Sequence, residues 1–392
     1  MSSLIRGTQV FLLLLAAFGF YSTWYLVYKN GTIGLMQQIR QHEPPLLPGT
    51  KAPLKQHFTG IERIDTELTV LTLVFWEQID GSLPGASLFC FMFAGQAIPA
   101  WSLLYVEGRR LSNRWRIVSF VTCWGLIIQS KTFAVFMPTY LAIHLFTSPT
   151  VSSRKTKDFA VNISRLLSIP ISLAVGFIVP AVFLALPAPS ILTYDQKQNW
   201  MAAWQVFPVW VEILQETFSF LFANLSGSRP NSSQASRDLD TQTIKSLRLV
   251  YISVLIIAGI TRITTFSLSL TSVLFPALFT PEYRGVFNPS KVFWPASISP
   301  TKMMSSIGEG VAQLLWYDDF CGSVALLVWS MALFVTKYSE TRPLFLSTTA
   351  KILAYSAVLV PLFGTCGCAV AFTWARDELV FEEGKAEDKK YN

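Results

Sequence analysis

Residues 166–186 read LLSIPISLAVGFIVPAVFLAL, an apolar run without a charged side chain. A helix needs about 20 mainly apolar residues to cross ~30 Å of hydrocarbon. Runs of this kind recur along the chain, which has 392 residues, 52% of them hydrophobic and 14% charged. An average soluble domain has roughly 25% charged residues. The composition therefore excludes an ordinary soluble fold and predicts a bundle of membrane-spanning helices.

The apolar runs predict about eight spans. They lie near residues 10–27, 86–106, 117–146, 166–186, 200–222, 249–276, 321–335 and 352–374. The stretch 117–146 is interrupted by Gln129, Ser130 and Lys131, so it predicts either one long tilted helix or two short ones. Residues 375–392 are polar and predict a charged cytosolic tail. The sequence thus indicates an all-α, polytopic transmembrane bundle, a single integral membrane domain over residues 1–392.

The charged residues are informative about partners. The net charge is +7, but Lys and Arg are scattered through short loops between the apolar runs. Basic loops beside spans are usual in membrane proteins, whereas nucleic acid is bound by a concentrated basic patch. The expected partners are therefore the lipid bilayer and a lipid-like small molecule, without nucleic acid. The sequence does not predict an oligomeric state.

The last residues of the chain contain a candidate localisation signal. Lys389 and Lys390 resemble the di-lysine retrieval signal of endoplasmic reticulum membrane proteins, which works only on a cytosolic tail. With eight spans both termini would be cytosolic, and the glycosylation sequons at Asn162, Asn224 and Asn231 would be lumenal. This interpretation predicts a glycosylated multi-pass protein of the endoplasmic reticulum membrane.

Carboxyl groups at membrane depth are the first candidates for function, because a charge there costs about 2.5–3.5 kcal/mol on insertion scales. In FWEQIDGSLPG, which starts at Phe75, Glu77 and Asp80 lie three residues apart, so a helix would place both near one face beside Trp76. An alternative is that these two acids are solvated at the membrane surface.

Two further groups of polar residues fall within predicted spans. LWYDDFCG, starting at Leu315, places Asp318 and Asp319 at the start of a span, where their alternative role is to cap a helix. In the fifth span, polar residues at helical spacing predict a stripe that faces other helices or a cavity. The residues of this stripe are Gln205, Glu212, Gln215 and Glu216. An alternative is that Glu216 pairs with Arg262.

These acids occur in a chain that is 14% aromatic, with 30 Phe, 12 Trp and 12 Tyr. Carboxylic acids in dry sites stay protonated near neutral pH and serve as proton donors. Aromatic faces stabilise cations. Together they predict a pocket that protonates a lipid-like substrate and guides the resulting carbocation. The candidate acids are Asp80, Glu77, Glu212, Asp318 and Asp319, and the candidates for cation stabilisation or substrate contact are Trp76, Trp200, Trp204, Trp210 and Gln205.

Several common enzyme motifs do not occur in the sequence. It lacks G-x-G-x-x-G, a Walker loop, H-E-x-x-H, a His-rich box and G-x-S-x-G. It also lacks a D-D-x-x-D run that would gather magnesium around a diphosphate, since DDFCG stops after two acids. The absence of these motifs favours protonation without a metal, and we expect neither a metal site nor a cofactor.

Four segments carry a resemblance to a known family. They are FWEQIDGSLPG, YVEGRR, VFNPSKVFWPASISP and LWYDDFCG. With these segments and its layout of spans, the chain resembles the fungal membrane-bound meroterpenoid cyclases of the ascofuranone, ascochlorin and macrophorin pathways. The resemblance implies cyclisation of a prenylated aromatic or quinone-derived substrate, through acid opening of a terminal epoxide or protonation of an alkene. It does not indicate which residue is the acid.

The sequence is also compatible with a second class of function, a transporter or channel. A transporter or channel would use the polar stripe of the fifth span as a pathway for its solute. Transporters often show internal repeats and matching broken helices. This chain shows one such break, from Gly81 to Gly85, and no evident repeat.

Overall fold

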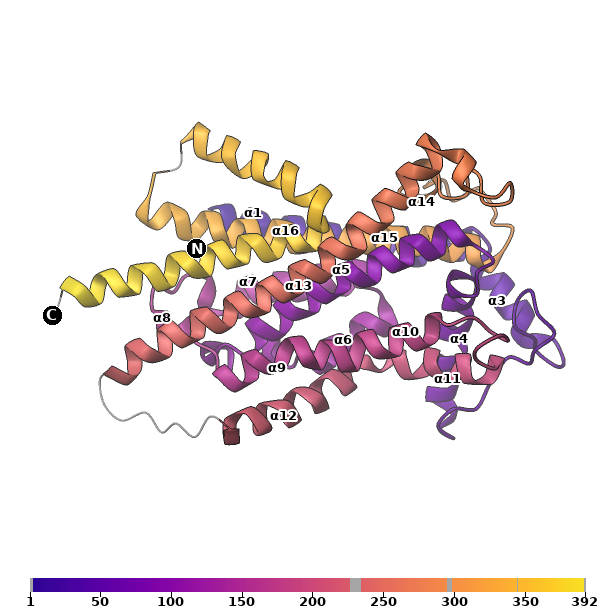
Figure 1. Cartoon of the computed structure of the whole chain (residues 1–392), viewed down its shortest axis with the longest axis horizontal. Coiled ribbons are helices and arrows are strands. Elements are labelled where there is room, and N and C mark those ends of the chain that lie inside the picture. Colours follow the sequence, from indigo (N-terminus) through magenta and orange to yellow (C-terminus); the bar gives the residue numbers. More distant parts are fainter. Residues whose placement is uncertain (1–2, 226–233, 295–297, 344, 391–392) are drawn as a thin grey trace.

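The computed structural model describes residues 3–225, 234–294, 298–343 and 345–390, which form a bundle of long helices (Figure 1). Six helices are long and apolar enough to cross a membrane, or seven if one bent pair counts as a span. The prediction of an all-α polytopic bundle is confirmed, although eight spans is slightly too many. Apolar side chains such as Leu14 and Phe220 are exposed on the outside of the bundle, as lipid contact requires.

The spans are built from the following helices. They are α1 (Ser3–Phe20) with a π turn and α2 (Leu26–Lys29), α5 (Pro84–Gly108), α9 (Ile163–Leu173) with a π turn and α10 (Val179–Ala185), α13 (Gln234–Leu274), α15 (Ile307–Thr341) and α16 (Leu346–Lys390). The bent pair consists of α11 (Tyr194–Gln205) and α12 (Phe207–Leu225), which meet at 65°. Shorter helices are α3 (Thr32–Gln41), α4 (Glu62–Ile79), α8 (Thr156–Phe159) and α14 (Pro289–Val292).

The stretch 117–146 forms two short helices, which was one of the two arrangements predicted, so it is not a single span. They are α6 (Val121–Lys131) and α7 (Phe133–Thr147). The chain reverses at Thr132, and the Tyr140 hydroxyl of α7 donates a hydrogen bond to the Val118 carbonyl before α6 at 3.1 Å. The two helices therefore form a hairpin whose outer ends lie together. Its tip lies at Lys131 and Thr132, and the Lys131 side chain is half exposed.

A second hairpin lies within α16, which is broken at Gly364 (φ 73°, ψ 176°). Figure 1 shows the part before the break folded back along the part after it, and Ile352 packs in one cluster with Phe372. The Gln96 side chain of α5 donates to the Phe363 carbonyl at 3.0 Å and accepts from the Cys366 amide at 3.1 Å. These bonds satisfy backbone groups that the break would leave unpaired in lipid. A Cβ at Gly364 would collide with the Gln96 amide.

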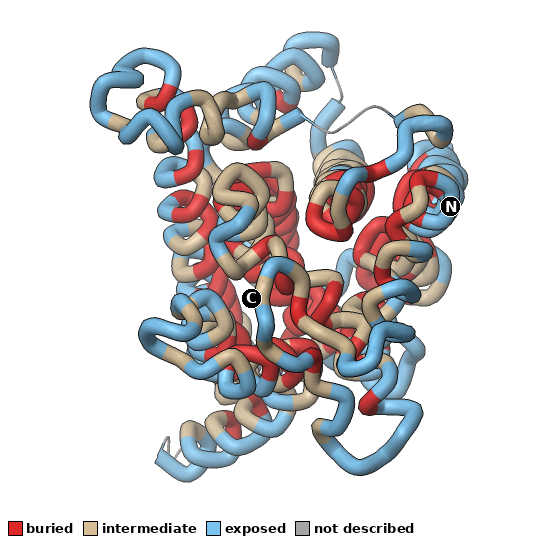
Figure 2. The backbone as a smooth tube through the Cα atoms, turned by 90° about the vertical axis from the view of Figure 1, so that its right-hand side faces the viewer, coloured by how far each residue is buried: buried red, intermediate tan, exposed pale blue. Residues whose placement is uncertain are grey.

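The segment predicted as a charged cytosolic tail, residues 375–392, belongs in its first part to the helix bundle. α16 continues through this region, and Arg376, Asp377, Val380 and Phe381 are all buried against the rest of the bundle. Arg376 and Asp377 are stabilised there by ion pairs with each other, with Glu107 of α5 and with Arg110, which follows α5. Their polarity therefore reflects a buried contact between helices. In Figure 2 the buried residues lie along the interior of the bundle, and exposed residues cover its outside.

The ends of the chain lie at one end of the bundle (Figure 1). The sequon at Asn162 lies at the same end, because Arg110 bridges Val161 in the backbone and pairs with Asp377 of α16 at 2.8 Å. Asn224, at the end of α12, follows Glu216, which pairs with Arg109 beside Arg110 at 3.3 Å. The prediction that these sequons lie across the membrane from the C-terminal segment is therefore wrong. Asn231 lies outside the described residues.

Candidate functional site

A cavity of about 1080 Å³ lies inside the bundle. Its walls come from α1–α2, α3, α4, α5, the α6–α7 tip, α10, α11, α12, α13 and α15. Most small-molecule sites enclose about 300–1,000 Å³, so this cavity has room for a large lipophilic molecule. Aromatic rings form much of the wall, and they belong to Trp24, Phe75, Phe91, Phe93, Trp101, Phe133, Phe177, Trp204 and Phe207.

The cavity reaches the outer surface of the bundle. Two of its lining residues, Phe91 of α5 and Val182 of α10, are 45% and 56% exposed. Both belong to helices that are long and apolar enough to span a membrane, so the surface on which they lie faces lipid. We infer that a hydrophobic molecule dissolved in the bilayer enters the cavity on this side.

Two of the described residues that line the cavity carry a carboxyl group, Glu67 and Asp318. Glu67 forms an ion pair with Lys131 at 3.1 Å, and both side chains are half exposed. Asp318 is buried, and its Oδ1 accepts a hydrogen bond from the Ala134 amide at 2.7 Å. Asp318 is therefore the acid that the interior of the cavity presents.

Asp318 caps the N-terminus of α7, whereas the sequence suggested that it caps the helix to which it belongs. It lies within α15 and accepts from the first turn of α7, whose N-terminus carries a partial positive charge. This end of α7 stabilises the carboxylate form of Asp318. A group that faces an apolar cavity and has a partner for its negative charge is suited to donate a proton.

Thr132 at the tip of the α6–α7 hairpin is strained. Its φ of 101° lies in a region that β-branched residues rarely adopt. Its hydroxyl is buried without a hydrogen-bond partner in the described part of the protein, and the residue lines the cavity. Strained residues and unpaired polar atoms concentrate at functional sites. Both features occur two residues from Ala134, which Asp318 contacts.

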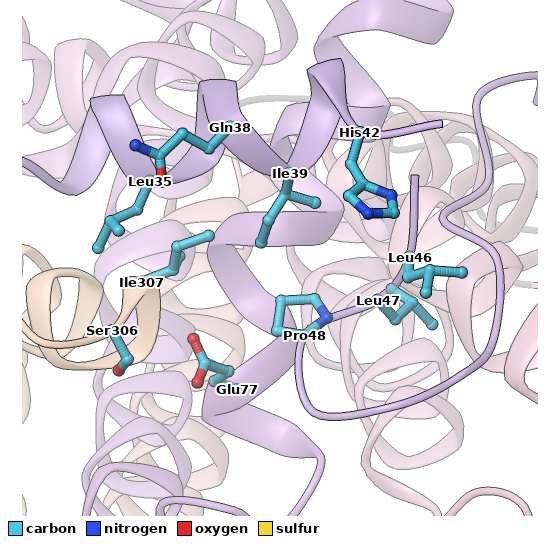
Figure 3. Close-up of a pocket in the computed structure, with 10 residues that line it drawn as sticks. All are labelled: Leu35, Gln38, Ile39, His42, Leu46, Leu47, Pro48, Glu77, Ser306 and Ile307. Atoms are coloured by element: carbon cyan, nitrogen blue, oxygen red, sulfur yellow. The ribbon is translucent and has the colours of Figure 1, made fainter. Parts of the chain in front are cut away.

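The predicted acids Glu77 and Asp80 lie elsewhere. Glu77 lines a separate cavity of about 450 Å³, where Figure 3 shows its carboxylate beside Ser306 and Ile307. It accepts from the Gly308 amide at 2.5 Å, and burial raises the pKa of this carboxyl despite that bond. Asp80 accepts from the amide and the hydroxyl of Ser82 at 2.8 and 2.6 Å, so it stabilises a turn.

The polar stripe predicted along the fifth span is interrupted, because the helix bends by 65° after Gln205. Glu212 forms an ion pair with Arg109 and accepts from the Thr122 hydroxyl at 3.2 Å. Glu216 also pairs with Arg109, so the alternative prediction that Glu216 pairs with Arg262 is wrong. Gln205 faces the cavity, whereas Glu212 does not line it. The fifth span thus lacks the continuous polar pathway that the transporter hypothesis requires.

Asp319 is also separate from the cavity, although it follows Asp318 directly. Its Oδ1 accepts from the Ser323 hydroxyl one turn later on α15, at 2.6 Å. Neither Asp80, Glu212 nor Asp319 lines the cavity that Asp318 faces. The structure therefore brings only Asp318, of the five predicted acids, into the large cavity.

Comparison with known proteins decides the family. The model of the CtvD domain matches residues 8–381. The chain belongs to the CtvD domain family. The terpene cyclase ascI of Acremonium egyptiacum is 30% identical over 83% of this chain and 80% of its own. The terpene cyclases ctvD of Aspergillus terreus and penA of Penicillium crustosum are 27% and 25% identical, over 94% and 93% of this chain and 98% and 94% of theirs. No solved structure matches.

These comparisons confirm the resemblance to fungal meroterpenoid cyclases and the prediction of a terpene cyclase. In this member of the CtvD family, two of the five residues predicted to stabilise a cation or contact substrate line the cavity. Trp204 packs among the rings of Phe75, Phe177 and Phe207, with centroids at 5.5–5.8 Å. Gln205 accepts a hydrogen bond from Gln129 at 2.7 Å.

The other three predicted tryptophans do not line the large cavity. The indole of Trp76 is buried and donates to the Pro48 carbonyl at 3.0 Å. Trp200 stacks on Phe183 with ring centroids 4.4 Å apart. Trp210 is 40% exposed, and its indole donates to the Ala203 carbonyl at 2.8 Å. The presence of a tryptophan near a predicted span was therefore not enough to identify the aromatic side chains that line the cavity.

A buried charged cluster, which the sequence did not predict, lies at the end of the bundle that holds the chain termini. Glu107 at the end of α5 accepts hydrogen bonds from Arg110 at 2.9 Å and from Arg376 at 2.6 Å. It also contacts the His144 ring at 3.1 Å. Asp377 accepts from Arg110 and from the Tyr251 hydroxyl at 2.8 and 2.7 Å.

Two cations balance two anions in this cluster, which joins α5, α7, α13 and α16. The side chains of Glu107, Arg110, Arg376 and Asp377 are at most 1% exposed. None of its residues lines either of the two cavities described above. We therefore interpret it as a structural connection between helices. The segment YVEGRR, which carries part of the family resemblance, contains Glu107 and Arg110.

Proposed function

We propose that this member of the CtvD family is a metal-independent membrane cyclase in which Asp318 protonates the terminal epoxide or alkene of a prenylated aromatic substrate. A single observation carries the proposal: Asp318 is a buried carboxyl on the wall of a large cavity that is lined by aromatic rings and open toward lipid. The relatives named terpene cyclase support the reaction class.

The proton balance of the proposed reaction is simple. Asp318 gives its proton to the epoxide oxygen, the C–O bond breaks and a carbocation forms; with an alkene, the proton adds to carbon. A double bond or a hydroxyl oxygen of the same substrate attacks the cation and closes a ring, and a base takes the proton that is lost. One proton enters and one leaves, so the overall reaction is an isomerisation.

The protein contributes three effects to this reaction. The Ala134 amide and the N-terminus of α7 stabilise the Asp318 carboxylate after proton transfer. The faces of Trp204, Phe177 and the other lining rings stabilise the cation. The apolar wall keeps water away from the cation, which water would otherwise capture.

Turnover in membranes tests the proposed function. Microsomes that contain the protein are incubated with a farnesylated phenol whose terminal double bond is epoxidised, and with the same compound without the epoxide. We expect a cyclic isomer of identical mass from at least one of them, identified by chromatography and NMR. If both compounds stay unchanged while a related cyclase converts its substrate in the same membranes, the proposal is wrong.

We also propose that the protein resides in the endoplasmic reticulum with its C-terminal segment in the cytosol. Since Asn162 and Asn224 lie at the same end of the bundle as that segment, they would then not be glycosylated. We expect no change in gel mobility on treatment with an N-glycosidase, and a C-terminal tag that antibodies reach after selective permeabilisation of the plasma membrane.

The opposite orientation gives a distinct result. Glycosidase would then shift the band, and replacing Asn162, Asn224 and Asn231 together by glutamine would remove the shift. This outcome would also contradict the di-lysine interpretation, because Lys389 and Lys390 would lie in the lumen. With a cytosolic C-terminus, replacing both lysines by serine is expected to let the protein leave the endoplasmic reticulum.

A further inference from the structure

Besides the Thr132 hydroxyl, two buried polar atoms belong to residues that line the large cavity and lack a hydrogen-bond partner in the described part of the protein. They are Oε1 of Gln78 on α4 and Nε1 of Trp204 on α11. Buried polar atoms are nearly always paired in proteins, so each unpaired one needs an explanation. One atom is an acceptor and the other a donor, which together complement a ligand that carries oxygen.

These two atoms belong to adjoining parts of the wall. Phe75 lies three residues before Gln78 on α4, so both point to one face of that helix, and the Phe75 ring contacts the Trp204 ring at 5.5 Å. The Gln78 amide is fixed in orientation, because its Nε2 donates to the Gly308 carbonyl at 3.0 Å. Oε1 of Gln78 is therefore the end that lacks a partner.

Gln78 is distant from Asp318. Gly308, to which Gln78 is bonded, and Asp318 lie ten positions apart on α15. At ~1.5 Å per residue, they are separated by about 15 Å along the helix. A prenyl chain of several isoprene units covers such a distance. The cavity is lined by Val74 and Phe75, which precede Gln78 on α4, and by Leu315, which lies between Gly308 and Asp318 on α15.

We propose that Gln78 and Trp204 bind the oxygen-bearing ring of the substrate, so that its prenyl chain extends toward Asp318. This inference rests on the proposed function and adds the orientation and the class of head group. Oε1 of Gln78 accepts from a ring hydroxyl, and Nε1 of Trp204 donates to a ring oxygen. Neither residue is charged, so the head group is neutral, a phenol or a hydroxylated carbonyl compound.

The variant Trp204→Phe tests this, because it removes the N–H group and keeps an aromatic ring. Two substrates with the same prenyl chain are compared, one with a phenol ring and one with an unsubstituted benzene ring. We expect kcat/KM for the phenol to fall about ten-fold, mainly through KM, as one lost hydrogen bond predicts. The benzene analogue loses only the contribution of the larger indole face to cation stabilisation, so we expect its kcat/KM to fall less than that of the phenol.

Two variants and a binding measurement complete the design. Trp200→Phe on the same helix is the matched control, since Trp200 stacks on Phe183 and does not line the cavity; it should leave the preference for the phenol unchanged. Gln78→Met should lower the preference as Trp204→Phe does. Binding of phenol and benzene analogues with saturated chains is measured by titration in detergent, so that no turnover is needed.

The outcomes separate the two proposals. If wild-type protein binds the saturated phenol more tightly than the benzene analogue and Trp204→Phe reduces the difference, the head-group site stands, even if no substrate is cyclised. If wild-type protein cyclises the phenol but Trp204→Phe weakens both analogues equally, or neither, the head-group site is wrong and the proposed function stands. Failure of the wild type to prefer the phenol in either measurement also overturns the inference.

Discussion

Replacing Asp318 with asparagine is expected to abolish cyclisation while leaving the fold intact. The amide has the same shape as the carboxyl, and its Oδ1 still accepts from the Ala134 amide, so the start of α7 stays capped. The amide has no acidic proton to give. General acid catalysis by a positioned side chain contributes about 10²–10⁴-fold, and we expect kcat to fall by at least this much in membrane assays of Asp318→Asn.

Asp319→Asn is the matched control for this prediction. Asp319 is the neighbouring acid on α15, it is bonded to Ser323, and it does not line the cavity. We expect its kcat to stay within a few-fold of the wild type at equal expression. Asp318→Ala, which also removes the cap, should lower the melting temperature in addition. Unchanged turnover by Asp318→Asn would show that Asp318 only caps α7 and that the acid lies elsewhere.

The sequence predicted the class of fold, because apolar runs of membrane length have few alternative structures. It did not predict the hairpin in α16, since the break at Gly364 looks like an ordinary glycine in a membrane helix. The structure shows that this break is stabilised by Gln96, which lies 267 residues before the Phe363 carbonyl that it binds. Such a partner cannot be recognised from the local pattern of either helix.

The structure brings an acid and aromatic rings to one cavity, as the sequence predicted, but only some of the predicted residues lie there. On α4, Glu77 and Asp80 attracted attention as acids near the membrane, but the face that lines the cavity holds Val70, Val74 and Gln78. Hydrophobic periodicity identifies a buried face without showing whether it packs against a helix or borders a cavity. Asp318 was one of five candidate acids, and only the tertiary arrangement distinguished it.

Replacing Arg110 with methionine is expected to destabilise the protein severely. Arg110 lies within the buried charged cluster and donates to Glu107, to Asp377 and to the Phe159 carbonyl. Methionine fills part of the space but leaves two buried carboxylates with one cation between them. Removing one partner of a buried ion pair costs about 3–5 kcal/mol, a large share of the roughly 5–15 kcal/mol that stabilises a typical domain. We expect low yield and a strongly lowered melting temperature in detergent.

Arg248→Met provides the comparison that separates burial from charge. Arg248 pairs with Glu378 of α16 at 2.6 Å, but about half of its side chain is exposed. Partly exposed ion pairs contribute about 0–1 kcal/mol, so this variant should melt within a few degrees of the wild type. The two arginines both connect to the same part of α16, and they differ chiefly in burial. If Arg110→Met instead kept its melting temperature and lost turnover, the cluster would take part in the reaction, and its interpretation as a connection between helices would be wrong.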